Sequence, residues 1–494
     1  MPNEISWPKH PKIYEINTWP WLTNLSDKLG HNIKLNDIPI DLLYQAVSFF
    51  DVVWLMGVWE RSPMGKEIAM NHEGLQEEYR KAIRYFNNQD VVGSPYSVYY
   101  YHVSSQLGGS DALKTFREDL EAHGVLLILD YVSNHVSIDH LWTLEKSNVF
   151  IRATLNDMMR KPYDYFSVGD RVYAHGRDPN FPPWTDTVQI NAFSTEARTK
   201  AINTLLSIAQ QCDGVRCDMA MLMTNKVFSK TWGEKAGTPL EKEYWDEIIT
   251  NVREKYPEFK FIAEVYWDME RDLIQQGFDY CYDKRLYDYL TSFNVKSIKN
   301  HLKAEFDYQS KLLRFIENHD EARAVSVFGT EASKAASIIC STLPGASLIY
   351  EGQTRGSKIK LPVQLGRGPI EEENEEITKH YNKLLRIIPR REFNNATWAL
   401  CETKPVGDDS SYNNIISYQW KSDDLRILIT VNYCSFFSKA HIIIDNISYG
   451  TDNWRFTDLL TWNEYRYKGE DLSRNGLYVE LESWKSHIFR LEKE

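Results

Sequence analysis

Four short segments of the chain each end an apolar run with acidic, amide or histidine side chains. They are residues 130–135, 214–218, 263–265 and 317–320. Carboxylates at the ends of buried strands are how an eight-stranded parallel barrel presents reactive groups at its carboxyl-terminal face. Two carboxylates that can face each other, with a third nearby, suit chemistry at a glycosidic bond. The segments therefore predict a site for acid–base and nucleophilic chemistry on a sugar.

Arg216 and Asp218 are two residues apart on a predicted strand, so both side chains leave the same face of it. A guanidinium beside a carboxylate favours its ionised form, and a charged carboxylate can attack an anomeric carbon. Glu264 lies in an apolar stretch, and such surroundings favour the protonated form that a general acid needs. The alternative for the first pair is a structural ion pair, and for Glu264 it is an ordinary strand end.

Asp320 follows His319 at the end of the seventh predicted strand, and His135 follows the third. Such residues are individually more often structural hydrogen-bonding groups, but four similar strand ends in one chain favour a shared site. A metal centre is the competing interpretation, because histidines and carboxylates are ligand types for Zn²⁺. Arg216 argues against it, since a fixed positive charge would lie beside the ion. We therefore predict no metal ligands among these residues.

Strand-like and helix-like runs alternate from about residue 12 to about residue 390. The strand-like runs are continuous and apolar, which is typical of parallel strands covered on both faces. They span residues 13–19, 52–58, 126–132, 213–218, 259–265, 278–282, 312–317 and 347–351. Apolar residues at helical spacing predict three helices: one that begins near Ser110, which could cap it, one over 202–209 and one over 377–388. Pro389 should end the third helix. Eight strands alternating with helices predict an α/β fold, a (β/α)8 TIM barrel.

Two regions interrupt this alternation. A long aromatic-rich insert separates the third and fourth predicted strands, and a loop of that length is more often functional than idle. After about residue 394, short alternating strands predict an antiparallel β-sandwich. The predicted domains are the first part of the barrel at 1–137, the insert at 138–195, the second part of the barrel at 196–393 and the sandwich at 394–494.

The composition sets limits on the partners of the chain. It has 494 residues, enough for two or three domains, and its net charge of −12 argues against a nucleic-acid partner. No stretch reaches the roughly 18 consecutive apolar residues that a membrane span requires. The amino terminus lacks the apolar core of a signal peptide. Six cysteines form no CxxC pair, which favours buried reduced thiols. We expect a cytoplasmic protein without membrane or nucleic-acid partners, and the sequence does not indicate the oligomeric state.

The four segments together resemble the conserved segments of the α-amylase family of retaining glycoside hydrolases, glycoside hydrolase family 13, over essentially the full length of the chain. The resemblance implies that Asp218 is the nucleophile, Glu264 the acid/base and Asp320 the carboxylate that stabilises the transition state. It also implies that the insert is the family's domain B and the sandwich its domain C. A small carbohydrate substrate is expected, bound with the help of Tyr96, His135, Arg216, His319 and Arg323.

Three positions refine the resemblance. Many relatives that cut starch internally carry a Lys-His pair where this chain has Met221 and Leu222. The run from Asp320 to Arg323 resembles that of exo-acting α-glucosidases and oligo-1,6-glucosidases, in which the arginine helps to close the pocket around a terminal sugar. Asn134 matches a calcium ligand of many relatives, but the insert shows no acidic cluster to complete such a site. We expect an exo-acting enzyme that requires no cofactor, with a structural calcium ion left open.

The prediction is thus a retaining α-glycosidase that acts on a short oligosaccharide or glucoside through a covalent glycosyl-enzyme. One alternative is an α-glucosyl transferase, isomerase or sugar phosphorylase with the same three carboxylates. The sequence does not separate these enzymes from a hydrolase, because hydrolysis and transfer differ in how the acceptor side of the site excludes water. A second is a catalytically inactive homologue that acts as a binding subunit, like the heavy chains of amino-acid transporters. For Arg323 the alternative is a surface ion pair with Glu321 or a neighbouring carboxylate.

Overall fold

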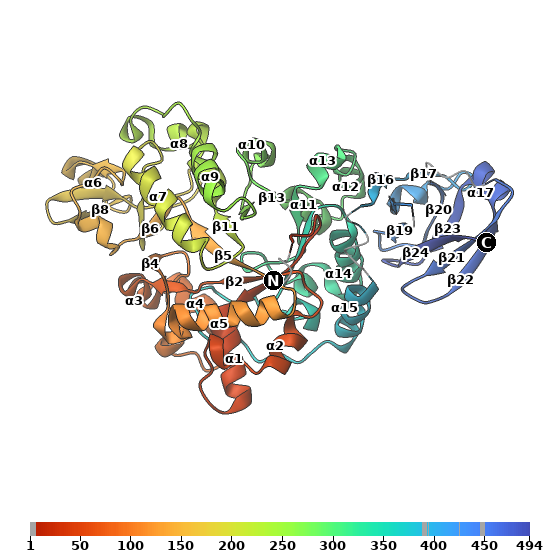
Figure 1. Ribbon diagram of the computed structural model, residues 1–494, viewed down its shortest axis with the longest axis horizontal. Coiled ribbons are helices and arrows are strands. Elements are labelled where there is room, and N and C mark those ends of the chain that lie inside the picture. Colours follow the sequence, from red (N-terminus) through yellow and green to blue (C-terminus); the bar gives the residue numbers. More distant parts are fainter. Residues whose placement is uncertain (1–5, 388–392, 394, 424, 445–449) are drawn as a thin grey trace. The chain divides into compact units, whose positions relative to one another are not determined.

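The structure is a computed structural model that describes residues 6–387, 393, 395–423, 425–444 and 450–494 (Figure 1). Its eight barrel strands are β1 (Lys12–Asn17), β2 (Val52–Met56), β5 (Leu126–Val132), β11 (Gly214–Asp218), β12 (Lys260–Ala263), β13 (Tyr280–Tyr282), β14 (Leu312–Arg314) and β15 (Ala346–Tyr350). They close in the order β1-β15-β14-β13-β12-β11-β5-β2. Every residue of these strands except Lys260 is buried, which explains why apolar residues predominate in most of them. The predicted barrel is confirmed.

Helices follow most of the barrel strands. They are α1 (Thr18–Leu29), α2 (Ile40–Val47), α3 (Pro63–Asn71), α4 (Glu73–Ala82), α5 (Gly109–Ala122), α6 (Leu155–Arg160), α7 (Thr195–Ile208), α8 (Asn225–Trp232), α9 (Tyr244–Lys255), α10 (Glu270–Gln275), α11 (Lys284–Thr291), α12 (Val295–His301), α13 (Phe306–Gln309), α14 (Ala324–Thr342), α15 (Glu375–Ile387) and α17 (Gly469–Asn475). The three predicted helical stripes fall in α5, α7 and α15. Ser110 lies in the first turn of α5 rather than at its cap, which is Gly108, and Pro389 lies outside the described residues.

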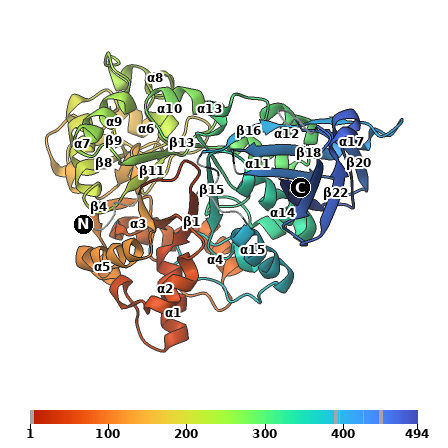
Figure 2. The same cartoon turned by 45° about the vertical axis from the view of Figure 1, so that its right-hand side comes forward.

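One compact unit of the chain comprises residues 14–282 and 359–370. Its insert after β5 contains a ribbon of β6 (His135–Ser137) and β10 (Thr187–Gln189), and a sheet of β7 (Arg152–Ala153), β9 (Arg171–Ala174) and β8 (Tyr165–Val168). A second excursion, which the sequence did not predict, pairs β3 (Trp59–Arg61) with β4 (Val98–Val103). Helices α7 and α9 lie side by side on the outside of this unit (Figure 2). The exact domain boundaries stay predictions.

The other unit comprises residues 6–13, 283–358 and 371–494. A six-stranded antiparallel sheet has the order β16 (Thr397–Leu400), β18 (Ile415–Lys421), β19 (Arg426–Asn432), β24 (Ser486–Lys493), β21 (Asn453–Asp458) and β22 (Glu464–Lys468). A three-stranded sheet joins β17 (Glu402–Lys404), β20 (Ser438–Ile443) and β23 (Leu477–Leu481). The predicted C-terminal domain of antiparallel sheets is therefore confirmed.

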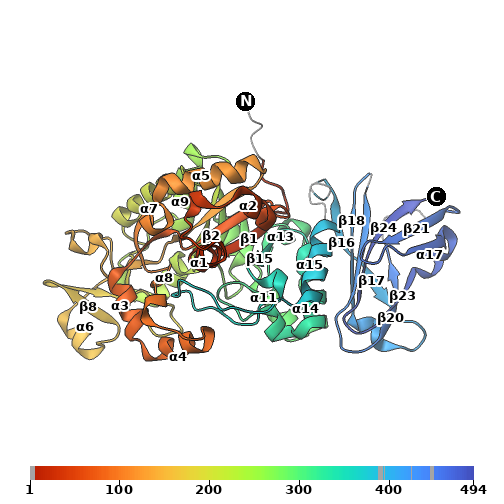
Figure 3. The same cartoon turned by 90° about the horizontal axis from the view of Figure 1, so that it is seen from below.

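The six-stranded sheet has two buried faces. Leu428 and Phe489 share a core with Ala440 of the three-stranded sheet. Ile427 and Ile429, on the opposite face, share a core with Leu290 of α11 and several residues of α14. Figure 3 shows α11, α14 and α15 beside strands β16 and β18. Because neighbouring residues of a strand point to opposite faces, one strand can serve both cores.

Two further sequence-based expectations concern membranes and cysteines. No helix within the described residues is long and apolar enough to cross a membrane. None of the six cysteines, all of which lie among the described residues, forms a disulfide, and five of them are buried. The prediction of buried reduced thiols is confirmed for those five.

Candidate active site

The register of three neighbouring strands brings the predicted catalytic groups of the first unit together. Arg216 on β11 is opposite Asp130 on β5, and the residue after it, Cys217, is opposite Ala263 on β12. Asp218 therefore ends β11 while Glu264 directly follows β12. Gly214 permits this close pairing, because a Cβ atom there would lie 2.8 Å from the carbonyl oxygen of Lys260. Parallel strands with matched ends thus place several carboxylates at one edge.

The guanidinium of Arg216 is the centre of this cluster. Its Nη1 donates to Oδ1 of Asp218 over 2.8 Å and lies 3.5 Å from Oδ1 of Asp130, and its Nη2 donates to Oε2 of Glu264 over 2.7 Å. All four residues are buried. Burial alone would lower the pKa of Arg216, but the negative charges around it, Glu264 foremost, raise that pKa well above its ordinary value. The arginine is therefore a permanent cation that holds both predicted catalytic carboxylates.

Aromatic rings surround the same guanidinium. Its carbon lies 5.1 Å from the ring centre of Tyr96, 5.3 Å from that of Trp54 and 5.8 Å from that of Tyr282. The hydroxyl of Tyr282 lies 3.3 Å from Nε of Arg216. Trp54 also donates its indole N–H to Oδ2 of Asp130 over 3.2 Å. These contacts fix the orientation of the planar guanidinium and so the positions of the carboxylates that it binds.

Glu264 is held by three hydrogen-bond donors. Besides Arg216, the backbone N–H of Met219 donates to Oε2 over 2.7 Å, and the hydroxyl of Tyr266 donates to Oε1 over 2.9 Å. Met219 has φ 44° and ψ 45°, a left-handed conformation that is uncommon for a residue with a side chain. The surroundings of Glu264 are therefore more polar than its apolar sequence neighbours suggested. The carboxyl group is positioned by specific donors, and not by a hydrophobic pocket alone.

His135 lies where the chain turns from β5 into the insert. Its ring is 5.0 Å from that of Trp184 in the insert. Burial lowers the pKa of His135 to about 4, although a hydrogen bond with the backbone of Tyr96 acts in the opposite direction. The ring is therefore neutral at pH 7, and it can donate or accept one hydrogen bond without adding charge to the cluster.

The predicted site residues of the second unit form their own local network. Nε2 of His319 lies 3.0 Å from Oδ2 of Asp320, whose side chain is 42% exposed. The side-chain oxygen of Asn318 accepts hydrogen bonds from the backbone N–H groups of Asp320 (2.9 Å) and Glu321 (2.8 Å). This turn fixes the backbone of the segment and leaves the Asp320 carboxylate partly open to solvent.

Arg323 is buried and makes specific contacts. Its Nη1 donates to Oε1 of Glu317 over 2.6 Å and to the carbonyl oxygen of Glu351 over 2.8 Å. Its guanidinium carbon lies 4.3 Å from the ring centre of Tyr350. The ion-pair partner of Arg323 is thus the buried Glu317. The alternative interpretation, an ion pair at the surface with Glu321 or a neighbouring carboxylate, is wrong about the partner and its position. The role of Arg323 in substrate binding stays a prediction.

Met221 and Leu222 belong to a short 3-10 helix, Ala220–Met223, that follows the nucleophile position. Both side chains are buried. They contribute apolar packing and offer no polar contact of the kind that a Lys-His pair would make.

A calcium ion at Asn134 does not fit the contacts of that residue. Nε2 of Gln189 donates to the side-chain oxygen of Asn134 over 2.8 Å and to its carbonyl oxygen over 2.9 Å. The oxygen that would ligate an ion is therefore already an acceptor for an amide of the same chain. Within the described residues, no group of three or more His, Cys, Asp or Glu side chains could hold a metal ion.

Sequence reasoning missed several residues of this arrangement. The backbone N–H of Met219 has no signal in a sequence, because its role depends on a left-handed turn. Tyr282 ends the sixth strand, but its sequence does not indicate that its hydroxyl meets Arg216, and Gln189 is one polar residue in an insert that holds many. Tyr266 was within reach, since it is two residues after Glu264 and so faces the same side in an extended chain.

A family model described as "Alpha amylase, catalytic domain" matches residues 195–398. Among curated proteins, the chain is 23% identical over 271 residues to the alpha-amylase MalA of Haloarcula japonica, a match that covers 52% of this chain and 36% of that protein. It is 23% identical over 417 residues to an alpha-glucosidase of Candida albicans, covering 72% of this chain and 67% of that protein. The chain thus spans little more than a third of the first relative and about two thirds of the second.

Solved structures show the same fold at lower identity. A maltogenic alpha-amylase, AmyB, from Thermotoga neapolitana superposes with a TM-score of 0.68 at 18% identity, covering 98% of both chains. An alpha-amylase from Geobacillus thermoleovorans, complexed with acarbose, gives a TM-score of 0.67 at 17% identity and covers 99% of both chains. The barrel and the C-terminal sheets together are therefore an arrangement that these amylases share.

Proposed function

We propose that the chain is a member of the α-amylase family of glycoside hydrolases, which its matches to that family support, and that it hydrolyses α-glucosidic bonds of short oligosaccharides or glucosides with retention of configuration. The observation that carries the proposal is the shared guanidinium of Arg216. It binds Asp218 and Glu264 at the same time, over 2.8 Å and 2.7 Å. A double displacement at a sugar carbon requires two carboxyl groups close together, and the shared guanidinium holds these two in the same place.

The proposed reaction has two displacements. In the first, protonated Glu264 gives its proton to the glycosidic oxygen while Asp218 attacks the anomeric carbon, so the aglycone leaves as an alcohol and a glycosyl ester forms. In the second, water attacks the same carbon from the opposite face and Glu264 takes up its proton, which releases the sugar and restores both carboxyl groups. Two inversions at one carbon give net retention.

Arg216 supports this cycle electrostatically. Its guanidinium stabilises the ionised Asp218 that must attack, and it cannot itself transfer a proton because it stays charged. Three carboxyl groups, Asp130, Asp218 and Glu264, surround one cation. Arg216 therefore partly neutralises the carboxylates that take part in both displacements.

Asp320 is proposed as the third carboxylate, which binds hydroxyl groups of the reacting sugar and stabilises the oxocarbenium-like state. The support is the resemblance of its segment to the family and its partial exposure beside His319. Tyr96, His135, His319 and Arg323 are proposed to contribute to the same sugar subsite. For His135 the neutral ring is consistent with hydrogen bonding to a hydroxyl.

We also propose that the enzyme prefers the ends of short substrates to the interior of starch. The support is the apolar, buried character of Met221 and Leu222, which provide no polar contact on the leaving-group side. A cytoplasmic location is proposed on the six free cysteines, which suit a reducing compartment.

The test is a panel of maltose, isomaltose, sucrose, soluble starch and sugar 1-phosphates, with products identified over time. The proposal expects glucose release from a short α-glucoside, with proton NMR showing the α-anomer first. A β-anomer as the first product would rule out retention. A rapid fall in iodine staining of starch before any glucose appears would rule out the preference for chain ends. Transfer products in place of free glucose would instead identify a glucosyl transferase with the same carboxylates.

A further inference from the structure

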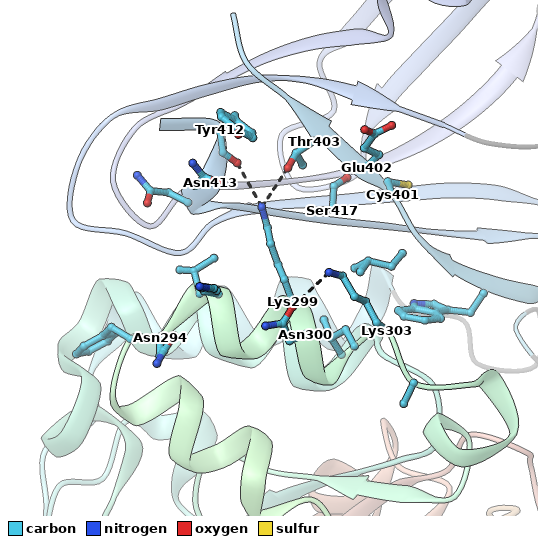
Figure 4. A pocket seen from close by; sticks show the side chains of 18 of the residues that line it. Asn294, Lys299, Asn300, Lys303, Cys401, Glu402, Thr403, Tyr412, Asn413 and Ser417 are labelled. Carbon is cyan, nitrogen blue, oxygen red and sulfur yellow. Dashed lines mark hydrogen bonds between the residues drawn. The ribbon is translucent and has the colours of Figure 1, made fainter. Parts of the chain in front are cut away.

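A cavity of about 1360 Å³ lies within the second unit, between α12 and the strands at the near edge of the C-terminal sheets (Figure 4). Its other wall is formed by β16, β17 and the 3-10 helix Ser410–Asn414. A space of this size exceeds the range of about 300–1,000 Å³ that is typical of small-molecule sites, so it can admit a metabolite with its hydration water. None of the residues that line it belongs to the predicted active site.

The charge of the lining is strongly one-sided. Helix α12 and the residue shortly after it contribute Lys296, Lys299 and Lys303, whereas the only acidic side chain of the lining is Glu402. Glu402 lies 3.6 Å from Lys404, which is outside the cavity. The lining therefore carries about two uncompensated positive charges at neutral pH.

Lys299 crosses the cavity from α12 to the opposite wall (Figure 4). Its Nζ donates to Oγ1 of Thr403 over 3.0 Å and to the carbonyl oxygen of Tyr412 over 3.3 Å. Both acceptors are neutral, and the described part of the chain places no carboxylate within ion-pair distance of this lysine. Burial, with a smaller effect of Lys303, lowers the pKa of Lys299 to about 8, so the side chain is mostly protonated at pH 7. A partly buried ammonium without a counter-charge is costly unless an anion supplies it.

The neighbouring lysines increase this cost. Lys296 and Lys299 are three residues apart on α12, and Lys303 follows two residues after the helix ends, close enough for its charge to act on Lys299. Within the described residues, the hydrogen-bond partner of Lys303 is also neutral, since its Nζ donates to Oδ1 of Asn300 over 3.2 Å. An anion between these ammonium groups would replace mutual repulsion with attraction.

The rest of the lining is suited to a polyhydroxylated body. It offers amide side chains on both walls, and these groups can donate and accept hydrogen bonds. They are Asn294, Asn300, Asn413 and Asn414, to which Tyr412 adds an aromatic ring. A phosphate monoester carries nearly two negative charges at pH 7 and three acceptor oxygens. Its charge therefore matches the excess positive charge of the lining.

We propose that this cavity binds a phosphorylated sugar, whose phosphate contacts Lys299 and Lys303 and whose hydroxyl groups contact the amides. The site is separate from the proposed hydrolysis, so it does not depend on that function.

The test is isothermal titration calorimetry of the full chain with glucose 6-phosphate, inorganic phosphate and glucose at constant ionic strength. Glucose 6-phosphate should bind with a Kd below about 1 mM, and both inorganic phosphate and glucose should bind at least about tenfold more weakly. Glucose binding as tightly as glucose 6-phosphate would overturn the role of the phosphate. Inorganic phosphate binding as tightly would overturn the recognition of the sugar.

Variants locate the binding in this cavity. Lys299→Met keeps much of the side-chain length without the charge and should weaken glucose 6-phosphate binding by at least about tenfold. Lys303→Gln, at an exposed position, should weaken glucose 6-phosphate binding severalfold. This second variant keeps the test valid if Lys299→Met does not fold. Lys114→Met is the matched control, because Lys114 is an exposed lysine of α5 that does not line the cavity. Unchanged affinity in both cavity variants would overturn the proposal, as would the absence of binding by the parent protein.

Discussion

The backbone N–H of Met219 donates a hydrogen bond of 2.7 Å to Oε2 of Glu264, the oxygen that also accepts from Arg216. The left-handed conformation of Met219 is what turns this N–H toward the carboxylate. Such a conformation costs a residue with a side chain on the order of 1 kcal/mol, and it persists where the surrounding structure requires it. Backbone strain at this position is therefore coupled to the placement of the proposed acid/base.

The first prediction compares two substitutions at this position. Met219→Gly and Met219→Ala both remove the partly buried side chain, but only glycine adopts a positive φ without strain. Urea unfolding should therefore show Met219→Gly to be more stable than Met219→Ala by about 1 kcal/mol. The glycine variant should retain activity, because the backbone donor to Glu264 is unchanged. Equal stability of the two variants would show that the turn is not strained.

The second prediction concerns the proposed nucleophile and acid. Asp218→Asn and Glu264→Gln should each lower the rate on an unactivated α-glucoside by at least about a thousandfold, because the two groups act as a unit. The near-identical shapes of the amides should leave the fold intact, as judged by circular dichroism.

A leaving group that needs no proton distinguishes the two roles. With an activated aryl glucoside, Glu264→Gln should recover much of the first displacement, whereas Asp218→Asn should not. Glu118→Gln, at an exposed position of α5, is the control and should behave like the parent. Rates within about tenfold of the parent for either variant on the unactivated substrate would contradict the assignment.

The third prediction concerns pH and His135. Burial lowers the pKa of His135 to about 4, and an unfolded chain titrates near the ordinary value of 6.5. Between these values the unfolded state binds the proton and the folded state does not. The stabilising contribution is therefore complete above about pH 6.5 and is lost as the pH falls to about 4.

Urea unfolding at a series of pH values measures this effect. His135→Gln should reduce the slope of unfolding free energy against pH in that window by up to about 1.4 kcal/mol per pH unit, whatever its effect on stability at pH 7. His31→Gln, at an exposed histidine, is the control. An unchanged slope in the His135 variant would mean that the ring is not kept neutral by burial.

The fourth prediction concerns metal ions. Because Gln189 donates to both oxygens of Asn134, EDTA should leave the Tm and the activity of the protein unchanged. Gln189→Ala should destabilise the protein by about 2–4 kcal/mol, since it leaves buried polar groups without partners. The exposed Gln106→Ala is the matched control and should have little effect. A fall in Tm on adding EDTA, reversed by calcium, would contradict the prediction.

The sequence predicted the barrel well because its strands are buried on both faces and carry an unmistakable apolar pattern. It also predicted the contact of Arg216 with Asp218, since residues two apart on a strand must face the same side. It could not predict that Arg216 binds Glu264 as well, because that contact depends on the register of β11 against β12. The ion pair of Arg323 with Glu317 was equally hidden, since nothing in the spacing says which of several carboxylates a buried arginine will meet.

Strand β19 separates two hydrophobic cores, with Leu428 in one and Ile427 and Ile429 in the other. The C-terminal sheets are consequently not an independent module, because they share a hydrophobic core with α11 and α14. Deleting them would uncover the apolar side of α14 and α11, and a large exposed apolar surface promotes self-association. A recombinant fragment that stops before the sheets would need compensating polar substitutions on those helices. In related sequences, substitutions in the core on one face of β19 are therefore expected to be correlated with substitutions in the core on its other face.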